Sequence, residues 1–255
     1  MAADLERRFG GVTRLYGESG AQRLRAAHIC VVGIGGVGSW AAEAFARTGI
    51  GAITLIDLDM VAESNTNRQI HALGDIYGQA KVDAMAERIR AIHPACRVST
   101  IEDFVTPENT AQMLTADFSF VVDAIDQART KVSMINHCRK AGIPIITAGA
   151  AGGQLDPTQI RIDDLARTVQ DPLLAKVRSQ LRKDHGFTRK PGTKFGIAAV
   201  YSTEPLRYPK PAAQCDTQTI SGGLNCAGFG SSVAVTAGFG LAAAAYAIRR
   251  IAEGI

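Results

Sequence analysis

The residues best suited to chemistry follow a glycine-rich turn between two apolar runs. The turn carries Gly33, Gly35, Gly36 and Gly38 and leads into a predicted helix. Because these positions lack side chains, phosphate oxygens can approach the backbone N–H groups and the positive end of the helix dipole. Asp57 ends the second apolar run, 19 residues after Gly38, where a carboxylate can accept hydrogen bonds from ribose hydroxyls. This spacing predicts a nucleotide site.

Further charged and amide side chains follow predicted strands or begin predicted helices. Because parallel strands end at one edge of a sheet, we expect these side chains to converge there. Arg68 and Lys81 would neutralise phosphate oxygens, and Asp126 would hold Mg²⁺, which binds carboxylate and phosphate oxygens together. Arg129 and Lys131 would either contact phosphate or lie on the exposed face of a helix. Asn65 and Gln69 would orient the phosphates, and Asp59 would either bind the nucleotide or support a residue that does.

The sequence GIGGVG also satisfies the dinucleotide pattern G-x-G-x-x-G, so an NAD-dependent oxidoreductase is an alternative. Nicotinamide chemistry needs no cation pair beside the phosphates. A triphosphate with magnesium accounts for Arg68, Lys81 and Asp126 together. The residues therefore favour ATP over NAD.

Five segments, GIGGVG, LIDLD, SNTNRQ, GQAK and DAID, together resemble the adenylation domain of the E1-like activating enzymes. That superfamily uses ATP to adenylate a carboxylate. Within it, the chain resembles the tRNA threonylcarbamoyladenosine dehydratases from about Arg8 to the last helix. The segments that carry this narrower resemblance are RFGGVTRLYG, residues 28–59, residues 64–73 and AGGQLDPTQI.

The resemblance implies an activity and several partners. ATP would activate the threonyl carboxylate of N6-threonylcarbamoyladenosine in tRNA, and the carboxyl carbon would then close onto the carbamoyl nitrogen. The resemblance also implies a homodimer in which Arg14 reaches the ATP of the partner subunit, with Arg7 and Arg8 as close alternatives to Arg14. An ordinary surface arginine is the other interpretation of Arg14. It further allows a monovalent cation and a cysteine desulfurase or other sulfur-acceptor partner.

A second function stays open, in which the chain adenylates the C-terminus of a sulfur-carrier or ubiquitin-like protein and hands it to a thiol. Cys226 is the candidate thiol because it lies at a glycine-rich helix entry, where the pKa of a thiol can be lowered. A small buried residue is the alternative for Cys226. The chain has five cysteines and no C-x-x-C pair, so we expect reduced thiols and no zinc.

Seven cations and one acid lie between residues 176 and 194. In an arbitrary chain such a run is most often a solvated helix face. Given the tRNA substrate that the resemblance implies, we expect it to contact phosphates, which supply most of the sequence-independent affinity for nucleic acids. Three neighbouring rings would stack on bases or pack in the core, namely His185, Phe187 and Tyr201.

The elements that position these residues alternate between strands and helices. This order predicts an α/β, Rossmann-like E1 adenylation fold with a mostly parallel central sheet flanked by helices. Thr106-Pro107 and Asp171-Pro172 each predict a helix start. The first helix is predicted near residues 20–27. Strands are predicted near residues 28–33, 52–57, 97–101, 118–123 and 143–147.

We expect residues 1–255 to form one domain, since 255 residues with 46% hydrophobic content can bury a large core. Its predicted parts are a nucleotide-binding core (28–150), a strand and loop elaboration (151–227) with the basic segment 176–194, and a C-terminal helix (228–251).

The last helix is almost uncharged but rich in small residues. It is about 17 apolar residues long, at the lower limit for a bilayer, so we expect a core helix rather than a membrane span. Gly238 and Gly240 predict that its backbone approaches another element closely. Met1 begins a polar segment without the apolar stretch of a secretory signal, and the predicted location is therefore the cytoplasm.

Overall fold

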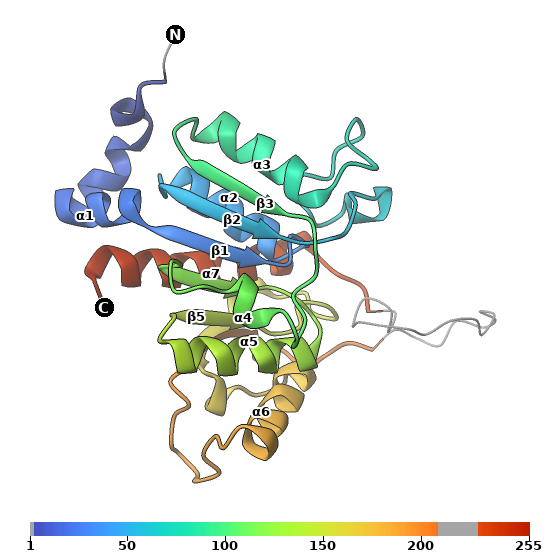
Figure 1. Cartoon of the computed structure of the whole chain (residues 1–255). Coiled ribbons are helices and arrows are strands. Elements are labelled where there is room, and N and C mark those ends of the chain that lie inside the picture. The colour runs from blue at the N-terminus through green and yellow to red at the C-terminus, as the bar shows by residue number, and fades with distance from the viewer. Residues whose placement is uncertain (1–2, 209–228) are drawn as a thin grey trace.

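The computed structural model describes residues 3–208 and 229–255, which form a twisted sheet with helices on both faces (Figure 1). The sheet has seven strands in the order β3-β2-β1-β4-β5-β7-β6. They are β1 (His28–Val32), β2 (Ala52–Ile56), β3 (Arg97–Ile101), β4 (Phe120–Asp123), β5 (Ile145–Ala148), β6 (Ile160–Asp164) and β7 (Ala198–Ser202).

Six of the strands run parallel, and β6 pairs antiparallel with β7 at one edge. The central strands are buried on both faces, which is why they read as continuous apolar runs in the sequence. The predicted fold class and the five predicted strands are confirmed. Strands β6 and β7 extend the same sheet beyond residue 151.

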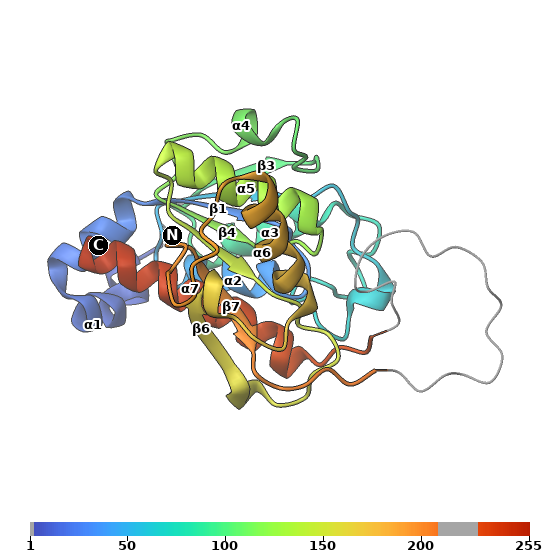
Figure 2. The ribbon, with the colours of Figure 1, turned by 90° about the horizontal axis from the view of Figure 1, so that it is seen from below.

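Helices cover both faces of the sheet, one layer on each face (Figures 1 and 2). One apolar cluster joins α1, α2, α3 and α7 to one face, and a second joins α5 and α6 to the other. The helices are α1 (Leu5–Ala26), α2 (Gly38–Arg47), α3 (Lys81–Ile92), α4 (Thr110–Met113), α5 (Ala128–Ala141), α6 (Pro172–Asp184) and α7 (Val233–Glu253). Short 3-10 turns span Glu63–Asn65, Pro157–Gln159 and Leu165–Arg167.

The first helix begins well before the predicted start near residue 20. Asp4 caps it by accepting a hydrogen bond from the N–H of Arg7 (2.9 Å), and a kink at Gly17, where φ is 72°, divides it. Few residues of α1 are buried, so its first half carries little apolar periodicity. The buried residues of α1 all lie after Gly17, in the half that the sequence signalled, whereas Val12 and Tyr16 of the first half pack on the core only partly buried.

The two predicted helix starts have different outcomes. Asp171 caps α6 as predicted, since one carboxylate oxygen accepts a hydrogen bond from the N–H of Leu174 (2.8 Å). Thr106 instead closes a turn with Asn109, whose N–H donates to the Thr106 hydroxyl (3.3 Å). Helix α4 follows only at Thr110, so the prediction of a helix starting at residue 107 was wrong by three residues.

The last helix begins at Val233 rather than at residue 228 and lies in the core against α2. Within the described residues, none of the helices has the length and apolar character that crossing a membrane requires. A Cβ at Gly240 would overlap the carbonyl oxygen of Val37, and one at Gly238 would meet the terminal methyl of Ile160. The predicted close approach of this helix is therefore confirmed.

These two glycines give a matched test of packing against α2. We expect Gly240→Ala to lower the free energy of unfolding by about 1–3 kcal/mol, because the added methyl meets rigid backbone. Gly238→Ala meets only a side-chain end that can move, and it gains helix propensity of about 1 kcal/mol, so it should be close to neutral. Urea denaturation of both variants checks this, and equal losses would contradict it.

Candidate functional site

A cavity of about 460 Å³ opens at the carboxyl ends of the central strands. It collects side chains and backbone from the loops that follow β1, β2 and β4, as expected for an open parallel sheet. The predicted site residues that line it are Gly33, Gly35, Gly36, Asp57, Asp59, Asn65, Arg68, Gln69, Lys81 and Asp126. Gly38 and Arg14 are not among its lining residues.

The glycine loop takes a shape that requires small residues. Gly33 has φ of 87°, and a Cβ there would lie 3.0 Å from the backbone of Ala124. A Cβ at Gly35 would meet nothing within 4 Å, so this position leaves open space beside the backbone. A Cβ at Gly38 would overlap the carbonyl oxygen of Gly33, so Gly38 lets α2 begin close to the loop rather than facing the cavity.

Asp57 holds the glycine loop and the turn after β2 together. One carboxylate oxygen accepts a hydrogen bond from the N–H of Ile34 (2.6 Å), and the other accepts from the N–H of Asp59 (2.9 Å). Burial raises the pKa of Asp57, and the nearby Lys81 and these N–H groups act in the opposite direction. Each oxygen has a further lone pair, so the carboxylate can still accept a hydroxyl from the cavity.

Two cations face the cavity from different elements. Lys81, the first residue of α3, is buried, and its Nζ lies 2.6 Å from Oδ2 of Asp59. Arg68 donates from one guanidinium nitrogen to the carbonyl of Ser64 and to Oδ1 of Asn67, both at 2.9 Å. The guanidinium has five N–H donors, so Arg68 keeps donors for an anion in the cavity.

The two amides near these cations differ in their partners. Oδ1 of Asn65 accepts the N–H of Ala62 (3.1 Å), which fixes the turn that carries Arg68. Gln69 is buried, and its Oε1 has no hydrogen-bond partner among the described residues. A buried unpaired amide oxygen at a cavity wall can accept a hydrogen bond from a ligand.

Asp126 follows β4 and lines the cavity. Its carboxylate makes no hydrogen bond or ion pair within residues 3–208 and 229–255. In the same residues no group of three or more His, Cys, Asp or Glu side chains could hold a metal. A Mg²⁺ here would thus be bound as Mg²⁺ commonly is, by one carboxylate, phosphate oxygens and water.

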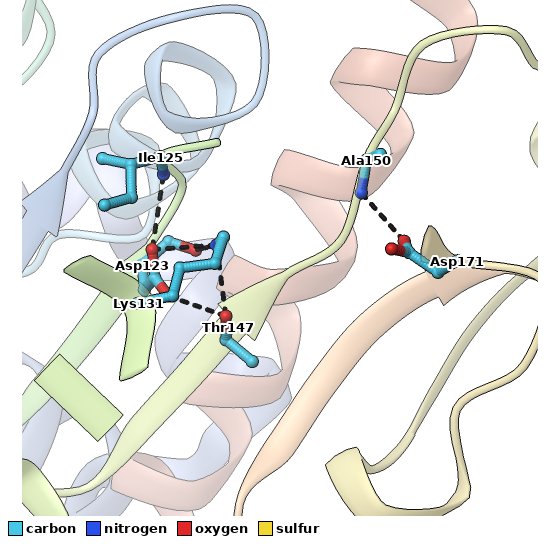
Figure 3. A network of polar contacts seen from close by, with 6 residues as sticks. All are labelled: Asp123, Ile125, Lys131, Thr147, Ala150 and Asp171. Carbon is cyan, nitrogen blue, oxygen red and sulfur yellow. Dashed lines mark hydrogen bonds and ion pairs between the residues drawn. The ribbon is translucent and has the colours of Figure 1, made fainter. Parts of the chain in front are cut away.

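The two basic residues after Asp126 do not face the cavity. Lys131 is fully buried and forms an ion pair of 2.9 Å with Asp123 (Figure 3). Both interpretations of Lys131, phosphate contact and an exposed helix face, were therefore wrong. Arg129 is exposed and lies 3.4 Å from Glu108, as its exposed-face interpretation predicts.

Arg14, the predicted ligand from the first helix, lies away from the cavity. It is an exposed residue of α1 and lines a separate hollow with Glu18, Arg25 and His93. Within one subunit it does not reach the glycine loop. A role at ATP would require the Arg14 of a second copy, as the resemblance implies.

Several cavity-lining residues escaped the sequence interpretation. The loop after β3 contributes Asp103 to Thr106, and the loop after β5 contributes Gly149 to Gly152. The rule that found Asp57 and Asp126, that ligands bind beyond the carboxyl ends of strands, could have found both loops. Ser231 and Thr236 also line the cavity, and no local signal marks them because they lie far away in the sequence.

The basic segment 176–194 comprises most of α6 and the loop that leads to β7. Since β7 runs parallel to β5, this loop lies at the amino ends of the strands, opposite the cavity (Figure 1). Phe187 and Tyr201 are buried, and the Arg139 guanidinium covers the Phe187 ring at 4.2 Å, so both rings pack rather than offer a stacking surface. The exposed cations are Lys176, Lys183, Arg189, Lys190 and Lys194.

The described cysteines are poorly suited to nucleophilic chemistry. Cys30, Cys96 and Cys138 are buried, and burial raises the thiol pKa of each, to about 11 for Cys96 and about 12 for Cys138. Cys215 and Cys226 lie outside the described residues. The candidate thiol therefore stays a prediction.

The chain matches the ThiF family over residues 10–253. It is 54% identical over 249 residues to the tRNA threonylcarbamoyladenosine dehydratase of Escherichia coli (strain K12), covering 96% of this chain and 93% of that protein. It is 51% identical to the enzyme of the same name from Haemophilus influenzae, covering 97% and 93%. The crystal structure of the Escherichia coli enzyme in complex with ATP superposes with a TM-score of 0.89 at 52% identity, covering 100% of this chain and 98% of that one. Its complex with AMP gives a TM-score of 0.88.

Proposed function

Since the chain belongs to the ThiF family, we propose that its cavity binds ATP and that the protein uses it to dehydrate N6-threonylcarbamoyladenosine in tRNA to the cyclic form. The observation that carries this is identity above 50% to two dehydratases over nearly the whole of both chains. The related structure solved with ATP and AMP supports the nucleotide. The two cations that line the cavity, Arg68 and Lys81, suit the phosphates of such a ligand.

The first step makes a leaving group. A threonyl carboxylate oxygen attacks the α-phosphorus of ATP, the bond to the β-phosphate oxygen breaks, and pyrophosphate leaves. The carboxylate is a poor electrophile, whereas the acyl adenylate can lose AMP. Arg68 and Lys81 spread the charge that develops on the phosphates, and Asn65 and Gln69 orient them. Asp57 accepts from the ribose, and Asp59 holds Lys81 in place.

The second step closes the ring. The carbamoyl nitrogen attacks the activated carbonyl carbon and loses its proton. The bond between that carbon and the oxygen of AMP then breaks, and the former carboxylate oxygen leaves as part of AMP. Because nucleophile and electrophile belong to one nucleoside, the protein supplies orientation and excludes water rather than a nucleophile. Such intramolecular arrangements contribute roughly 7–11 kcal/mol in well-oriented reactions.

Asp126 is the proposed Mg²⁺ ligand. Its carboxylate, free of protein partners in the described part of the chain, suits a cation that also takes phosphate oxygens. Bound there, Mg²⁺ would neutralise phosphate charge. A monovalent cation is a further proposed ligand of the protein.

The proposed assembly is a homodimer in which Arg14 of the partner subunit reaches ATP. The proposed RNA surface includes the exposed cations of α6 and of the loop that follows it, from Lys176 near the start of the helix to Lys190 and Lys194 in the loop. A tRNA is long enough to contact both ends of the sheet. The substrate supports a cytoplasmic location, and a cysteine desulfurase or sulfur-acceptor system is a further proposed partner.

The test is incubation with ATP, Mg²⁺ and tRNA bearing threonylcarbamoyladenosine, followed by nucleoside mass spectrometry at mild pH. We expect loss of one water from the nucleoside only when ATP is present, with one AMP released per ring formed. Rising salt should raise the KM for tRNA, because phosphate contacts release counterions. Omitting tRNA is the control for background ATP hydrolysis.

An unchanged nucleoside, from protein that still binds ATP, would contradict the proposed substrate. It would favour the alternative of an enzyme that adenylates the C-terminus of a sulfur-carrier or ubiquitin-like protein. Displacement of ATP by NAD(H), with no AMP formed, would contradict adenylation altogether.

A further inference from the structure

A fully buried lysine lies beneath the cavity. Lys131, near the start of α5, is 0% exposed, and its Nζ lies 2.9 Å from Oδ1 of Asp123 and 3.2 Å from the hydroxyl of Thr147 (Figure 3). The carbonyl oxygen of Asp123 lies at 3.5 Å. An ammonium has three donors, so each N–H of Lys131 has an acceptor.

The Asp123 carboxylate bonds to groups from three places in the fold, namely β5, α5 and the turn after β4. Asp123 ends β4, and its Oδ2 accepts the hydroxyl hydrogen of Thr147 in β5 (2.7 Å). Its Oδ1, besides binding Lys131 of α5, lies 3.3 Å from the N–H of Ile125, which donates to it (Figure 3). The carboxylate therefore anchors the turn that follows β4 to both β5 and α5.

That turn forms one wall of the cavity. Ala124, Ile125 and Asp126 all line the cavity. The backbone of Ala124 packs closely on Gly33, since a Cβ added at Gly33 would lie 3.0 Å from the Ala124 backbone. The Asp126 side chain has no hydrogen-bond partner among the described residues. Its position therefore depends on the backbone of the turn, which the Asp123 carboxylate holds.

Stability alone gives a weak reason for this ion pair. Buried ion pairs contribute little net stability, and apolar residues of similar volume often replace them without loss. This pair has a second consequence, because the same carboxylate also accepts the N–H of Ile125 and so helps to fix the turn that forms the cavity wall. Side chains that hold a metal ligand in place commonly matter about 10- to 100-fold for metal affinity or activity.

We propose that Asp123, Lys131 and Thr147 are positioning residues that hold the 124–126 turn and so place the Asp126 carboxylate for the magnesium complex of ATP. This inference rests on the proposed function for the identity of the ligand. None of the three touches the nucleotide. They act through the turn.

Thr147→Val is the sharpest variant, because it keeps the shape of the buried side chain and removes only the hydroxyl that donates to Asp123. Lys131 itself is a poorer test, since its removal leaves a buried carboxylate unpaired and destabilises the fold. We expect Thr147→Val to weaken ATP binding in the presence of Mg²⁺ by about tenfold. ATP binding without Mg²⁺ and the KM for tRNA should stay unchanged.

Isothermal calorimetry with ATP, with and without Mg²⁺, gives this readout without turnover. Thr147→Ser keeps the hydroxyl and should bind like the wild type. Thr54→Val is the matched control, because Thr54 is also a buried strand threonine, but its hydroxyl bonds to His28 (2.9 Å) rather than to the network that holds the 124–126 turn. It should lose thermal stability without losing Mg²⁺-dependent ATP affinity.

Wild-type affinity in Thr147→Val would overturn the inference, and so would an equal loss in Thr54→Val. A wild-type protein that binds ATP with Mg²⁺ but forms no cyclic nucleoside would contradict the proposed function alone. The calorimetric comparison would still decide whether the network positions Asp126.

Discussion

Replacing Asp126 by asparagine should lower the rate of cyclic nucleoside formation by about 10²- to 10³-fold, the range seen when one preorganised electrostatic group is removed. The substitution keeps the volume and removes the charge that would bind Mg²⁺. Because the Asp126 side chain has no partner among the described residues, we expect the melting temperature to stay at its wild-type value. Mass spectrometry of the nucleoside and a thermal melt measure the two quantities.

Arg129→Gln is the control for this variant. Arg129 lies three residues further along, is exposed, does not line the cavity and forms its one ion pair among the described residues with Glu108, so its loss removes a nearby charge outside the cavity. Its activity should equal that of the wild type. Full activity in Asp126→Asn would remove Asp126 from the proposed mechanism, and a large fall in its melting temperature would assign it a structural role instead.

Arg68→Ala should reduce AMP formation by a comparable factor, about 10²- to 10³-fold. The loss should fall on kcat, because the guanidinium is proposed to stabilise charge that develops as pyrophosphate leaves. The backbone at Arg68 should stay in place, since its carbonyl accepts a hydrogen bond from Nε1 of Trp40 (2.9 Å) independently of the side chain. Pre-steady-state measurement of AMP release checks the step.

Arg68→Lys separates charge from geometry. The guanidinium is held by Ser64 and Asn67 and still offers donors to the cavity, whereas a lysine ammonium has three donors and no planar fork. We expect Arg68→Lys to recover only part of the activity that Arg68→Ala loses. Complete recovery would show that a point charge suffices, and unchanged AMP formation in Arg68→Ala would contradict a role at the phosphates.

Local sequence patterns predicted the half of the fold that carries the glycine loop. Strands such as β1 and β2 are buried on both faces, so their apolar runs stand out, and glycines and acids at their ends fall where an open sheet binds ligands. The amino-acid sequence alone therefore placed Asp57 and Asp126 at one edge of the sheet. The helix cap at Asp171 was also predictable from local sequence, because it depends only on Asp171 and on Leu174, three residues later.

Features that depend on distant contacts could not be predicted in the same way. Lys131 reads as a surface lysine in the sequence, because nothing near it reveals that Asp123 and Thr147 surround it in the folded chain. The antiparallel direction of β6 depends on its pairing with β7, which begins 38 residues after the start of β6. Arg14 also illustrates the limit, since its proposed site lies on another subunit.

Helix α7 connects two places that are far apart. At its start Thr236 lines the cavity, and at its end the carbonyl of Ala252 accepts a hydrogen bond from Nε of Arg23 in α1 (2.9 Å). Its 21 residues span about 31 Å as one rigid rod. The same α1 carries Arg14. Helix α7 is therefore part of the cavity wall at one end and part of the support of α1 at the other, so the segment that carries Arg14 and the cavity share one continuous helix.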